Sequence, residues 1–346
     1  MKTELFLALA LAPTLFAAKS ETPSTKSSAP RYDADLYHKD REAITSSAEL
    51  LYWTINEGSL DYAQKMIQAP TLAPGQSSWA IGKAKHGTYG IDPGLRISIG
   101  YFNAPKYWEV WGEYTWLHIH GNTRANAPRN SSLFLTGTFP QVFSNPVKKA
   151  KSSLSFNYNT GYAMLDRVFI PNPHLRVKAL GGIGTVWLRQ DWHVRYLSTT
   201  AEATTIRNRW NFGGAGMRGG VFCDWYWGEN IYLTGGATVG GFLGGYHNSA
   251  KQTSSVVPDQ DLRNSDYKDV RAALMAQFLF GFAWQKNYCS ISRVEVFAGW
   301  ELTPWFNLQE VRRSTSSTTI SDARETWLNT GVVALQGFTA RVSFNW

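Results

Sequence analysis

The chain has 346 residues, of which only 17% are charged and 14% are aromatic, and its net charge is +8. Soluble domains carry about 25% charged residues, so the composition argues against an ordinary soluble domain, while a mean hydropathy of −0.28 excludes a bundle of apolar transmembrane helices. The positive charge is compatible with nucleic acid, but aromatic-rich alternating stretches favour an anionic lipid surface or solute, and we expect no nucleic-acid partner. Few charges, many aromatics and thirty glycines are typical of a transmembrane β-barrel.

The N-terminus predicts export. Lys2 precedes an apolar run from Leu5 to Ala18 that is too short to span a bilayer and ends in small residues, which is the pattern of a secretory signal peptide. Residues 19–47 are rich in Ser, Thr, Pro and mixed charge, so we expect a polar N-terminal arm. The barrel is predicted over residues 48–346.

From residue 48 onward, apolar and polar residues alternate with a period of two, as in strands with two unlike faces. We expect the apolar face of each strand to meet lipid and the polar face to line a lumen. The apolar faces comprise Leu51, Trp53 and Ile55; Leu95, Ile97, Ile99 and Tyr101; Trp108, Val110, Tyr114 and Trp116; Leu154, Phe156, Tyr158 and Tyr162; Leu175, Val177 and Ala179; Leu274, Ala276, Phe278, Phe280, Phe282 and Trp284; and Val294, Val296 and Ala298.

Short and long connections alternate along the chain. Short turns are predicted near 103–106, 170–174, 224–229 and 285–289, and long loops near 58–80, 121–150, 247–268 and 309–325. Outer-membrane barrels have short periplasmic turns and long external loops, so the pattern predicts an all-β, antiparallel up-and-down barrel of about ten strands, with a range of ten to fourteen.

Aromatic residues cluster where the strands would cross the two membrane interfaces, as in barrel girdles. Those beside the short turns are Tyr101, Tyr107, Trp108, Trp225, Tyr226, Trp227, Trp284 and Tyr288, and those beside the long loops are Trp116, Trp192, Tyr196, Trp210, Tyr246, Trp305 and Trp327.

The final strand closes the predicted barrel. Its apolar face contains Phe338, Val342, Phe344 and Trp346, and the chain ends on an aromatic residue. A terminal strand of this kind is the segment that barrel-assembly machinery captures by strand addition, so we expect these four residues to act as an assembly signal. The alternative is an edge strand of a soluble sheet.

A helical span is the main rival over residues 231–245. This run of fifteen residues is almost wholly apolar, but six of them are glycine. A span needs about twenty residues, and each glycine costs a helix about 1 kcal/mol relative to alanine. A glycine-rich strand is therefore favoured.

Charged residues on the polar faces are the candidate lumen lining. The five basic and four acidic side chains that we expect to face inward are Arg96, Glu109, Glu113, Arg176, Lys178, Arg293, Glu295, Glu301 and Arg341. The predicted loop at 121–150 adds a basic cluster formed by Arg124, Arg129, Lys148, Lys149 and, just beyond, Lys151. If the loop folds over a pore mouth, this cluster predicts weak anion selectivity. The alternative is that the cluster binds the phosphates of lipopolysaccharide.

Catalytic chemistry has little support. Asp191 and His193 share one strand face, and His118 and His120 share another, but no nucleophile or third metal ligand can be placed beside either pair. Gly182-Ile183-Gly184 lacks the third glycine and the following helix of a dinucleotide-binding turn. We expect no enzymatic activity, no metal and no cofactor.

Three stretches carry a resemblance to a known family. They are Tyr158–Asp191, Trp210–Gly245 and Gly337–Trp346, supported by Asp92-Pro93-Gly94 and by Trp111–Trp116. Together they resemble the Legionella-type pore-forming outer membrane proteins, which are similar to the major outer membrane protein-like porins of chlamydial relatives. The resemblance runs from about residue 48 to the end and departs from the family in ending on Trp346 and in having only two cysteines.

The resemblance implies a porin in the outer membrane of a Gram-negative-type bacterium, with a passive aqueous pore for small hydrophilic solutes or ions. Its expected partners are outer-membrane lipid and lipopolysaccharide, the barrel-assembly machinery and those solutes, and copies of the chain could associate as a homo-oligomer. The alternative function is a non-conducting surface barrel, either an adhesin or a structural protein, which a narrow lumen with side chains meeting across it would favour.

Overall fold

A computed structural model of the chain describes residues 42–66, 82–103, 106–128, 135–140, 147–228, 230–287, 293–314, 325–328 and 331–346. The predicted signal peptide and residues 19–41 of the predicted arm lie outside these residues. No helix in the described part is long and apolar enough to cross a membrane. The strands are β1 (Glu42–Glu57), β2 (Asp61–Met66), β3 (Gly82–His86), β4 (Asp92–Asn103), β5 (Trp108–Asn126), β6 (Leu135–Gly137), β7 (Val147–Asn172), β8 (Leu175–Ser198), β9 (Ala203–Tyr226), β10 (Ile231–Ser254), β11 (Arg263–Asn287), β12 (Arg293–Phe306), β13 (Val311–Ser314), β14 (Glu325–Leu328) and β15 (Val332–Asn345).

Ten of these strands form a closed antiparallel ring. The order around the ring is β1, β4, β5, β7, β8, β9, β10, β11, β12 and β15, with β15 paired back to β1. At the closing seam, Ile44 and Trp346 exchange two backbone hydrogen bonds of 2.8 and 3.0 Å. The predicted β-barrel of about ten strands is confirmed. The first strand begins at Glu42, six residues before the predicted start of the barrel.

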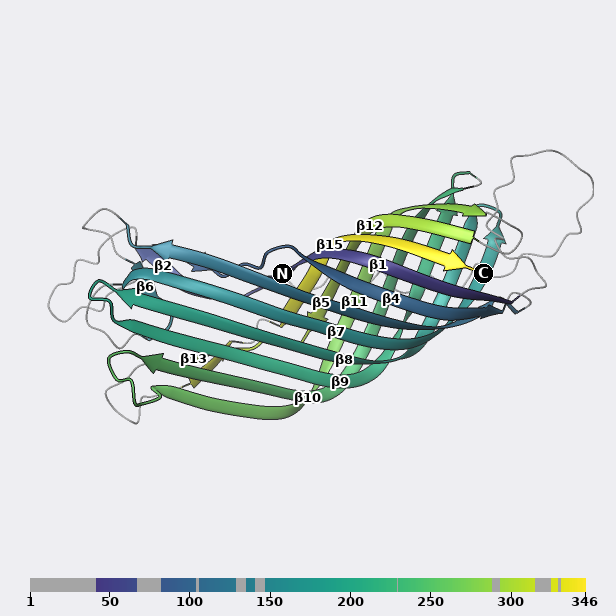
Figure 1. Ribbon diagram of the computed structural model, residues 1–346. Coiled ribbons are helices and arrows are strands. Elements are labelled where there is room, and N and C mark those ends of the chain that lie inside the picture. Colours follow the sequence, from purple (N-terminus) through teal and green to yellow (C-terminus); the bar gives the residue numbers. More distant parts are fainter. Residues whose placement is uncertain are drawn as a thin grey trace, which may run out of the picture. The chain divides into compact units, whose positions relative to one another are not determined.

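The two ends of the ring differ. Figure 1 shows the ring strands running obliquely from the end where the C-terminus is marked to the end that carries β2, β6 and β13. The β4–β5, β7–β8, β9–β10 and β11–β12 connections lie at the first end, and β2, β3 and β6 extend the sheet beside β7 at the other. The predicted long loop at 121–150 is wrong at both ends, because β5 continues to Asn126 and β7 begins at Val147.

An apolar belt surrounds the end with the short turns. On β11, Leu274, Phe278, Phe280, Phe282 and Trp284 are exposed, and on β15 the four residues of the predicted assembly signal are exposed as well. Their neighbours in sequence point into the ring, as period-two alternation requires. These outward faces are as predicted, and they provide the lipid-facing band of a membrane barrel.

The strands are longer than a bilayer requires. A strand of 24 residues, such as β8, β9 or β10, is about 80 Å long and rises about 60 Å at the usual tilt of roughly 40°. The apolar band of such barrels is about 25 Å tall. A large part of each of these strands therefore projects beyond the membrane on the side of the long connections, and we call this part the outer section.

The faces of the outer section reverse the prediction. Leu154, Phe156 and Tyr158 in the outer section of β7 are buried inside the ring, as is Tyr162 just below it, whereas we expected all four to meet lipid. Even-numbered residues face the lumen along most of β7. Nearer the short turn that follows β7, the odd-numbered residues Leu165 and Phe169 therefore face outward. The outer section is surrounded by water, so its apolar side chains are stabilised by turning inward, whereas in the membrane the outside is apolar.

The same reversal corrects the predicted outer girdle. Most of its members lie inside the ring and almost none of their surface is exposed, namely Trp192, Tyr196, Trp210, Tyr246 and Trp305. Leu51, Trp53 and Ile55 on β1 and Tyr226 in the other girdle are likewise inside. Trp116 does face outward, whereas Tyr288 and the side chain of Trp327 lie outside the described part of the chain.

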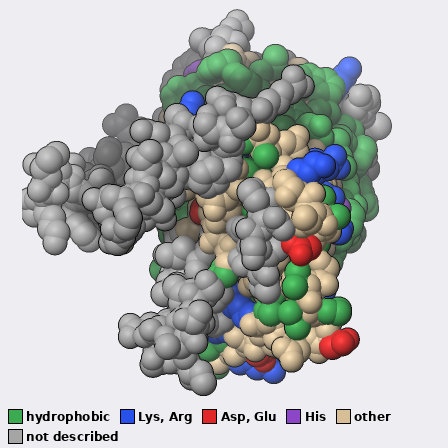
Figure 2. Space-filling model, turned by 90° about the vertical axis from the view of Figure 1, so that its left-hand side faces the viewer, with side chains coloured by type: hydrophobic (Ala, Val, Ile, Leu, Met, Phe, Trp, Pro, Cys, Tyr) green, Lys and Arg blue, Asp and Glu red, His purple; other side chains and the backbone are tan. Residues whose placement is uncertain are grey.

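Figure 2 looks onto the end of the ring that carries β2, β6 and β13. The described surface there is mainly backbone and uncharged polar side chains, with scattered basic and acidic groups, and hydrophobic side chains lie along the edge of the view. This mixture is typical of a water-exposed surface.

Candidate functional site: the barrel lumen

The lower lumen, between the strands of the membrane section, contains a polar cavity of about 180 Å³. All nine predicted lumen residues line it: Arg96, Glu109, Glu113, Arg176, Lys178, Arg293, Glu295, Glu301 and Arg341. They come from β4, β5, β8, β12 and β15, so the alternation placed them on the correct face of strands that are far apart in sequence.

Four further charged residues line the same cavity and were missed: Glu49, Asp166, Arg218 and Asp224. Glu49 was missed because we assigned the β1 apolar face to Leu51, Trp53 and Ile55, and the exposed residues Leu50 and Tyr52 would have indicated the correct face. Arg218 stands alone in a glycine-rich run, which gave no clear alternation. With these four included, the cavity carries six basic and seven acidic side chains, so its formal charge is slightly negative rather than slightly positive.

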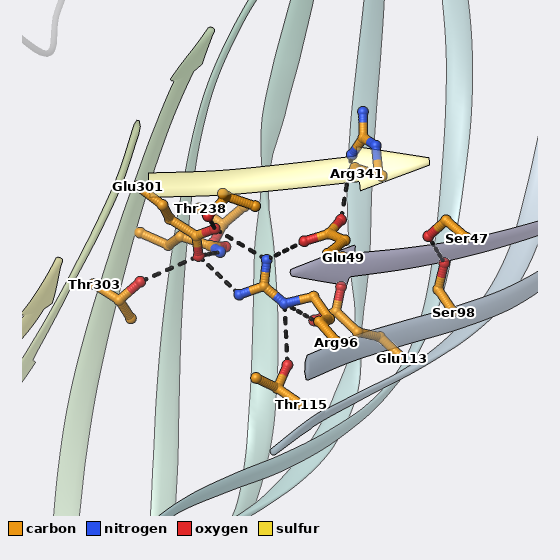
Figure 3. A network of polar contacts seen from close by, with 12 residues as sticks. Ser47, Glu49, Arg96, Ser98, Glu113, Thr115, Thr238, Glu301, Thr303 and Arg341 are labelled. Carbon is orange, nitrogen blue, oxygen red and sulfur yellow. Dashed lines mark hydrogen bonds and ion pairs between the residues drawn. The ribbon is translucent and has the colours of Figure 1, made fainter. Parts of the chain in front are cut away.

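Arg96 on β4 is the centre of the largest ion-pair network (Figure 3). Its guanidinium donates to Glu49 on β1 at 2.7 Å and to Glu301 on β12 at 2.9 Å, and its Nε donates to Thr115 on β5 at 3.0 Å. Arg96 is 6% exposed and Glu301 is 1% exposed. Charges that are this deeply buried are tolerated only when they are paired and hydrogen-bonded.

Arg218 on β9 extends the network across the lumen. Its Nη1 lies 3.4 Å from Glu113 Oε1 on β5, and Glu113 lies 3.8 Å from Arg96 Nε. Arg218 also donates to Gln277 on β11, and Gln277 donates to Glu301. Side chains from β4, β5, β9, β11 and β12 therefore meet in one layer, which we call the charged layer. Two strands of the ring, β7 and β8, separate β5 from β9, so these contacts cross the interior rather than follow the wall.

More ion pairs lie nearer the short turns. Glu295 accepts hydrogen bonds from Arg293 at 2.7 Å and from Arg341 at 3.1 Å, and Arg341 also lies 3.6 Å from Glu49. Arg176 pairs with Asp224 at 2.8 Å. The cavity is therefore lined by paired charges that the surrounding hydrogen bonds hold in place, in contrast to the free rings of charge that set ion preference in pores.

A second layer, made of aromatic rings, fills the lumen above the charged layer. Tyr158 on β7 and Trp305 on β12 have ring centroids 6.3 Å apart, although the two strands stand on opposite sides of the ten-strand ring. Trp53 packs on Tyr158 at 6.5 Å, and Phe242 packs on Trp305 at 5.3 Å. Trp53 and Trp305 are both fully buried. We call these four residues the aromatic layer, and their contacts reach across the lumen between β1, β7, β10 and β12.

A buried carboxyl group lies inside the outer section, beyond the lipid-facing belt. Glu57 Oε2 accepts a hydrogen bond from Tyr89 at 3.2 Å and another from Gln190, and Gln190 also donates to Tyr89 at 2.7 Å. Burial raises the pKa of Glu57 to about 8, although the hydrogen bonds from Tyr89, Gln190 and Gln309 oppose the shift. The folded protein therefore holds this carboxyl protonated at neutral pH, because the charged form is poorly solvated there.

The predicted basic cluster faces outward. Arg124 is an exposed residue of β5, and it is the register partner of Lys151 on β7. Lys148 is exposed and Lys149 half-buried on β7, and Arg129 lies outside the described residues. Because these residues sit on the outer wall of long strands, the expectation that this segment folds as a loop over the pore mouth is wrong for the described members.

The two candidate histidine pairs contact other polar groups in the structure. Asp191 binds three arginines rather than His193, with the shortest contact 2.7 Å from Arg209. His118 lies 2.9 Å from Ser155 Oγ, and His120 Nδ1 lies 3.6 Å from Asp92. Burial lowers the pKa of His118, with His120 adding to the effect. Within the described residues, no group of three or more potential metal ligands occurs.

Comparison with known proteins identifies one family. A family model described as Legionella pneumophila major outer membrane protein precursor matches residues 39–345. No curated protein sequence matches the chain significantly. Among solved structures, the chain is similar to the outer membrane protease OmpT from Escherichia coli, with 9% identity, coverage of 88% of this chain and 96% of that one, and a TM-score of 0.41. It is also similar to the toluene transporter TodX from Pseudomonas putida, with 10% identity, 88% and 90% coverage, and a TM-score of 0.29.

Proposed function

Because this chain belongs to the Legionella pneumophila major outer membrane protein family, and therefore to the bacterial outer membrane, we propose that it is a non-enzymatic structural barrel whose lumen is closed to hydrophilic solutes. The observation that carries the proposal is the contact between Tyr158 and Trp305, from opposite sides of the ring, at 6.3 Å. A diffusion pore needs a continuous water path, and the contact of buried aromatic rings across the interior supports a lumen that is blocked at this level.

The charged layer supports the same proposal. A solute that passed the aromatic layer would also have to separate Arg96 from Glu301 and Arg218 from Glu113. Separating a buried charged pair leaves an uncompensated charge and costs about 3–5 kcal/mol. A barrel of only ten strands is also close in size to those whose interiors are filled by side chains. The lumen is therefore closed twice, by two different kinds of contact.

A porin remains the second candidate, and one observation favours it. The lower lumen holds a cavity of about 180 Å³ that is lined by charges and has room for several water molecules, and a purely structural interior would be more stable if it were apolar. In this second function the charged layer acts as a gate that opens for small ions. The slightly acidic lining would then favour cations, in contrast to the anion preference that we expected from the loop.

Single-channel recording in a planar bilayer tests the proposal. We expect refolded wild-type protein in 1 M salt (a common condition, with a Debye length of about 3 Å) to give no stable conductance steps. Regular steps in the wild-type protein would overturn the proposal and support the porin. The variant Glu301→Gln separates the two closures, because it weakens the charged layer and leaves the aromatic layer intact.

We expect Glu301→Gln to stay closed, since Tyr158 and Trp305 still meet. The matched control is Thr303→Val, which removes the 3.4 Å hydrogen bond from Thr303 to Glu301 but leaves every charge of the layer in place. Steps that appear in Glu301→Gln but not in the wild-type protein or in Thr303→Val would show that the charged layer alone is the gate. In any protein that does conduct, neutralising Lys148, Lys149 and Lys151 should leave the reversal potential unchanged, because these lysines lie on the outer wall.

A further inference from the structure

Three arginines on the outer wall of β8 and β9 converge on one carboxylate. Asp191 lies 2.7 Å from Arg209 Nε, 3.1 Å from Arg207 Nη2 and 3.0 Å from Arg189 Nη2. The arginine side chains are 47%, 43% and 30% exposed for Arg189, Arg207 and Arg209, respectively. One carboxylate balances only one of the three guanidiniums, so two positive charges remain on this small area. Asp191 holds the three side chains together and leaves their remaining donors available.

The strand register places more basic residues above this group. Arg124 on β5, Lys151 on β7 and Arg195 on β8 are successive register partners in one row across the sheet. They lie four residues along β8 from Asp191, a distance of about 13 Å at the usual rise per residue. No acidic side chain belongs to that row of three. The six basic residues, which we call the basic wall, lie on the outward face of four neighbouring strands, β5, β7, β8 and β9.

An apolar groove lies below the basic wall on the same strands. Its volume is about 1070 Å³. Its floor consists of small residues, Gly161, Ala163 and Ala215, and its sides include Tyr114 and Met217. At Gly161 an added Cβ would come no closer than 3.6 Å to another residue, so the floor is open. Small residues on β7 and β9, between larger residues on the neighbouring strands, make this hollow in an otherwise apolar surface.

The groove and the basic wall meet at the membrane boundary. Trp187 on β8 is exposed and pairs with Asn159, whose other register partner is the exposed Trp116. Exposed tryptophans of this kind mark the level of the lipid headgroups. The groove lies on the membrane side of this row, and Arg189 lies two residues beyond Trp187 on the outer side. One ligand could therefore place acyl chains in the groove and anionic groups on the basic wall.

We propose that this surface is a binding site for the lipid A part of lipopolysaccharide, with an acyl chain in the groove and its phosphates on Arg189, Arg207 and Arg209. Arginine suits phosphate because its planar guanidinium donates two parallel hydrogen bonds. The long connections face the exterior, so the basic wall stands at the outer leaflet, where a phosphorylated glycolipid is the anionic lipid. The proposal does not depend on whether the lumen conducts.

Binding of purified diphosphoryl lipid A to the full-length protein in detergent tests this site, with native mass spectrometry as the readout. Each basic residue near an anionic lipid surface contributes about a fivefold gain in affinity, so replacing Arg189, Arg207 and Arg209 together by Gln should weaken binding about 100-fold. Gly161→Leu fills the groove without changing charge and should weaken binding about tenfold, since it displaces several methylene contacts. Each variant must first show the heat-modifiable migration of a folded barrel.

The matched control is Arg167→Gln, which removes an outward arginine from β7 at the other end of the membrane section and should leave lipid A binding unchanged. Inorganic pyrophosphate and phosphatidylglycerol distinguish the source of the phosphate. We expect neither to displace lipid A at equal concentration, because the first lacks acyl chains and the second carries a single phosphate. Equal binding of lipid A by the wild-type protein and the triple variant, or full competition by pyrophosphate, would overturn the proposal.

Discussion

The charged layer and the aromatic layer close the same lumen by different physical means. In the charged layer, Arg96, Glu301 and Arg218 exchange directed hydrogen bonds across the interior, and each charge depends on its partners. In the aromatic layer, Tyr158 and Trp305 simply fill space. Ion pairs can be separated and formed again, whereas tightly packed rings lose stability when any one of them is removed. The comparison indicates that stability resides mainly in the aromatic layer and specificity of arrangement in the charged layer.

Removing Phe344–Trp346 is expected to have the largest effect, because it opens the ring beside the charged layer. The deletion removes the hydrogen bonds between Ile44 and Trp346 and the last outward aromatics of β15. We expect secretion to continue and insertion into the outer membrane to fail, as it should also for Trp346→Lys. The measurement is membrane fractionation with a heat-modifiability gel, and a normal folded barrel in the truncated strain would contradict the prediction.

Trp305→Ala tests the aromatic layer and should lower the free energy of unfolding by about 3–5 kcal/mol, as for other large buried aromatics. The matched control is Phe280→Ala on the lipid-facing side of β11, where lipid can occupy the vacated space, so a smaller loss is expected. Urea titration in lipid vesicles, followed by gel shift, measures both variants. Equal losses would show that the rings inside the barrel are not packed as a core.

Glu57→Gln tests the buried carboxyl of the outer section through its pH dependence. The pKa of Glu57 is about 8 in the folded protein and 4.5 as an ordinary value, so the folded state binds more protons between these limits. Stability should therefore fall as pH rises from 4.5 to 8, by at most about 1.4 kcal/mol per pH unit. From pH 6 to pH 7.5, the wild-type protein should lose about 2 kcal/mol relative to Glu57→Gln. Parallel pH profiles for the two proteins would refute the prediction.

Replacing Arg96 and Glu301 together by Met should have the smallest effect, about 1 kcal/mol or less, because a buried ion pair can be exchanged for apolar side chains of similar volume at little cost. Glu49 and Glu113 keep arginine partners at 3.6 and 3.4 Å in this variant. The single variant Arg96→Met should be much less stable than the double variant, since it leaves Glu301 without its main partner. A double variant as unstable as Trp305→Ala would remove the distinction between the two layers.

Alternation in the sequence was sufficient for the membrane section of the fold. Phe280 and Phe338 face outward because lipid surrounds this section, and the polar residues that alternate with them in the sequence pattern, such as Glu295 and Arg341, face the lumen. The rule failed in the outer section, where Tyr158 and Trp210 turn inward because the surroundings are water. Within β7 the apolar residues change from even positions, such as Phe156 and Tyr158, to odd positions, such as Leu165 and Phe169, while the strand continues, and that change was a readable signal of the boundary.

The contacts across the lumen could not be predicted. The meeting of Tyr158 with Trp305 and of Arg218 with Glu113 depends on strand order, stagger and tilt together, and small changes in any of them would separate these side chains by several ångströms. Alternation assigns a residue to a face but not to a height in the barrel. The alternation pattern therefore could not predict whether side chains meet across the lumen.

The pairing of β1 with β15 has a consequence for the order of folding. These strands come from opposite ends of the described chain, so the hydrogen bonds that complete the ring, such as those between Ile44 and Trp346, join residues about as far apart in sequence as the described residues allow. Hairpins such as β9–β10 can form early from local contacts, whereas the seam must wait until all intervening strands are in place. Contacts of this kind slow folding because the entropy of the intervening chain is lost before they form. One edge of β1 can pair with β4 early, but its other edge must remain unpaired, and protected from aggregation, until β15 arrives.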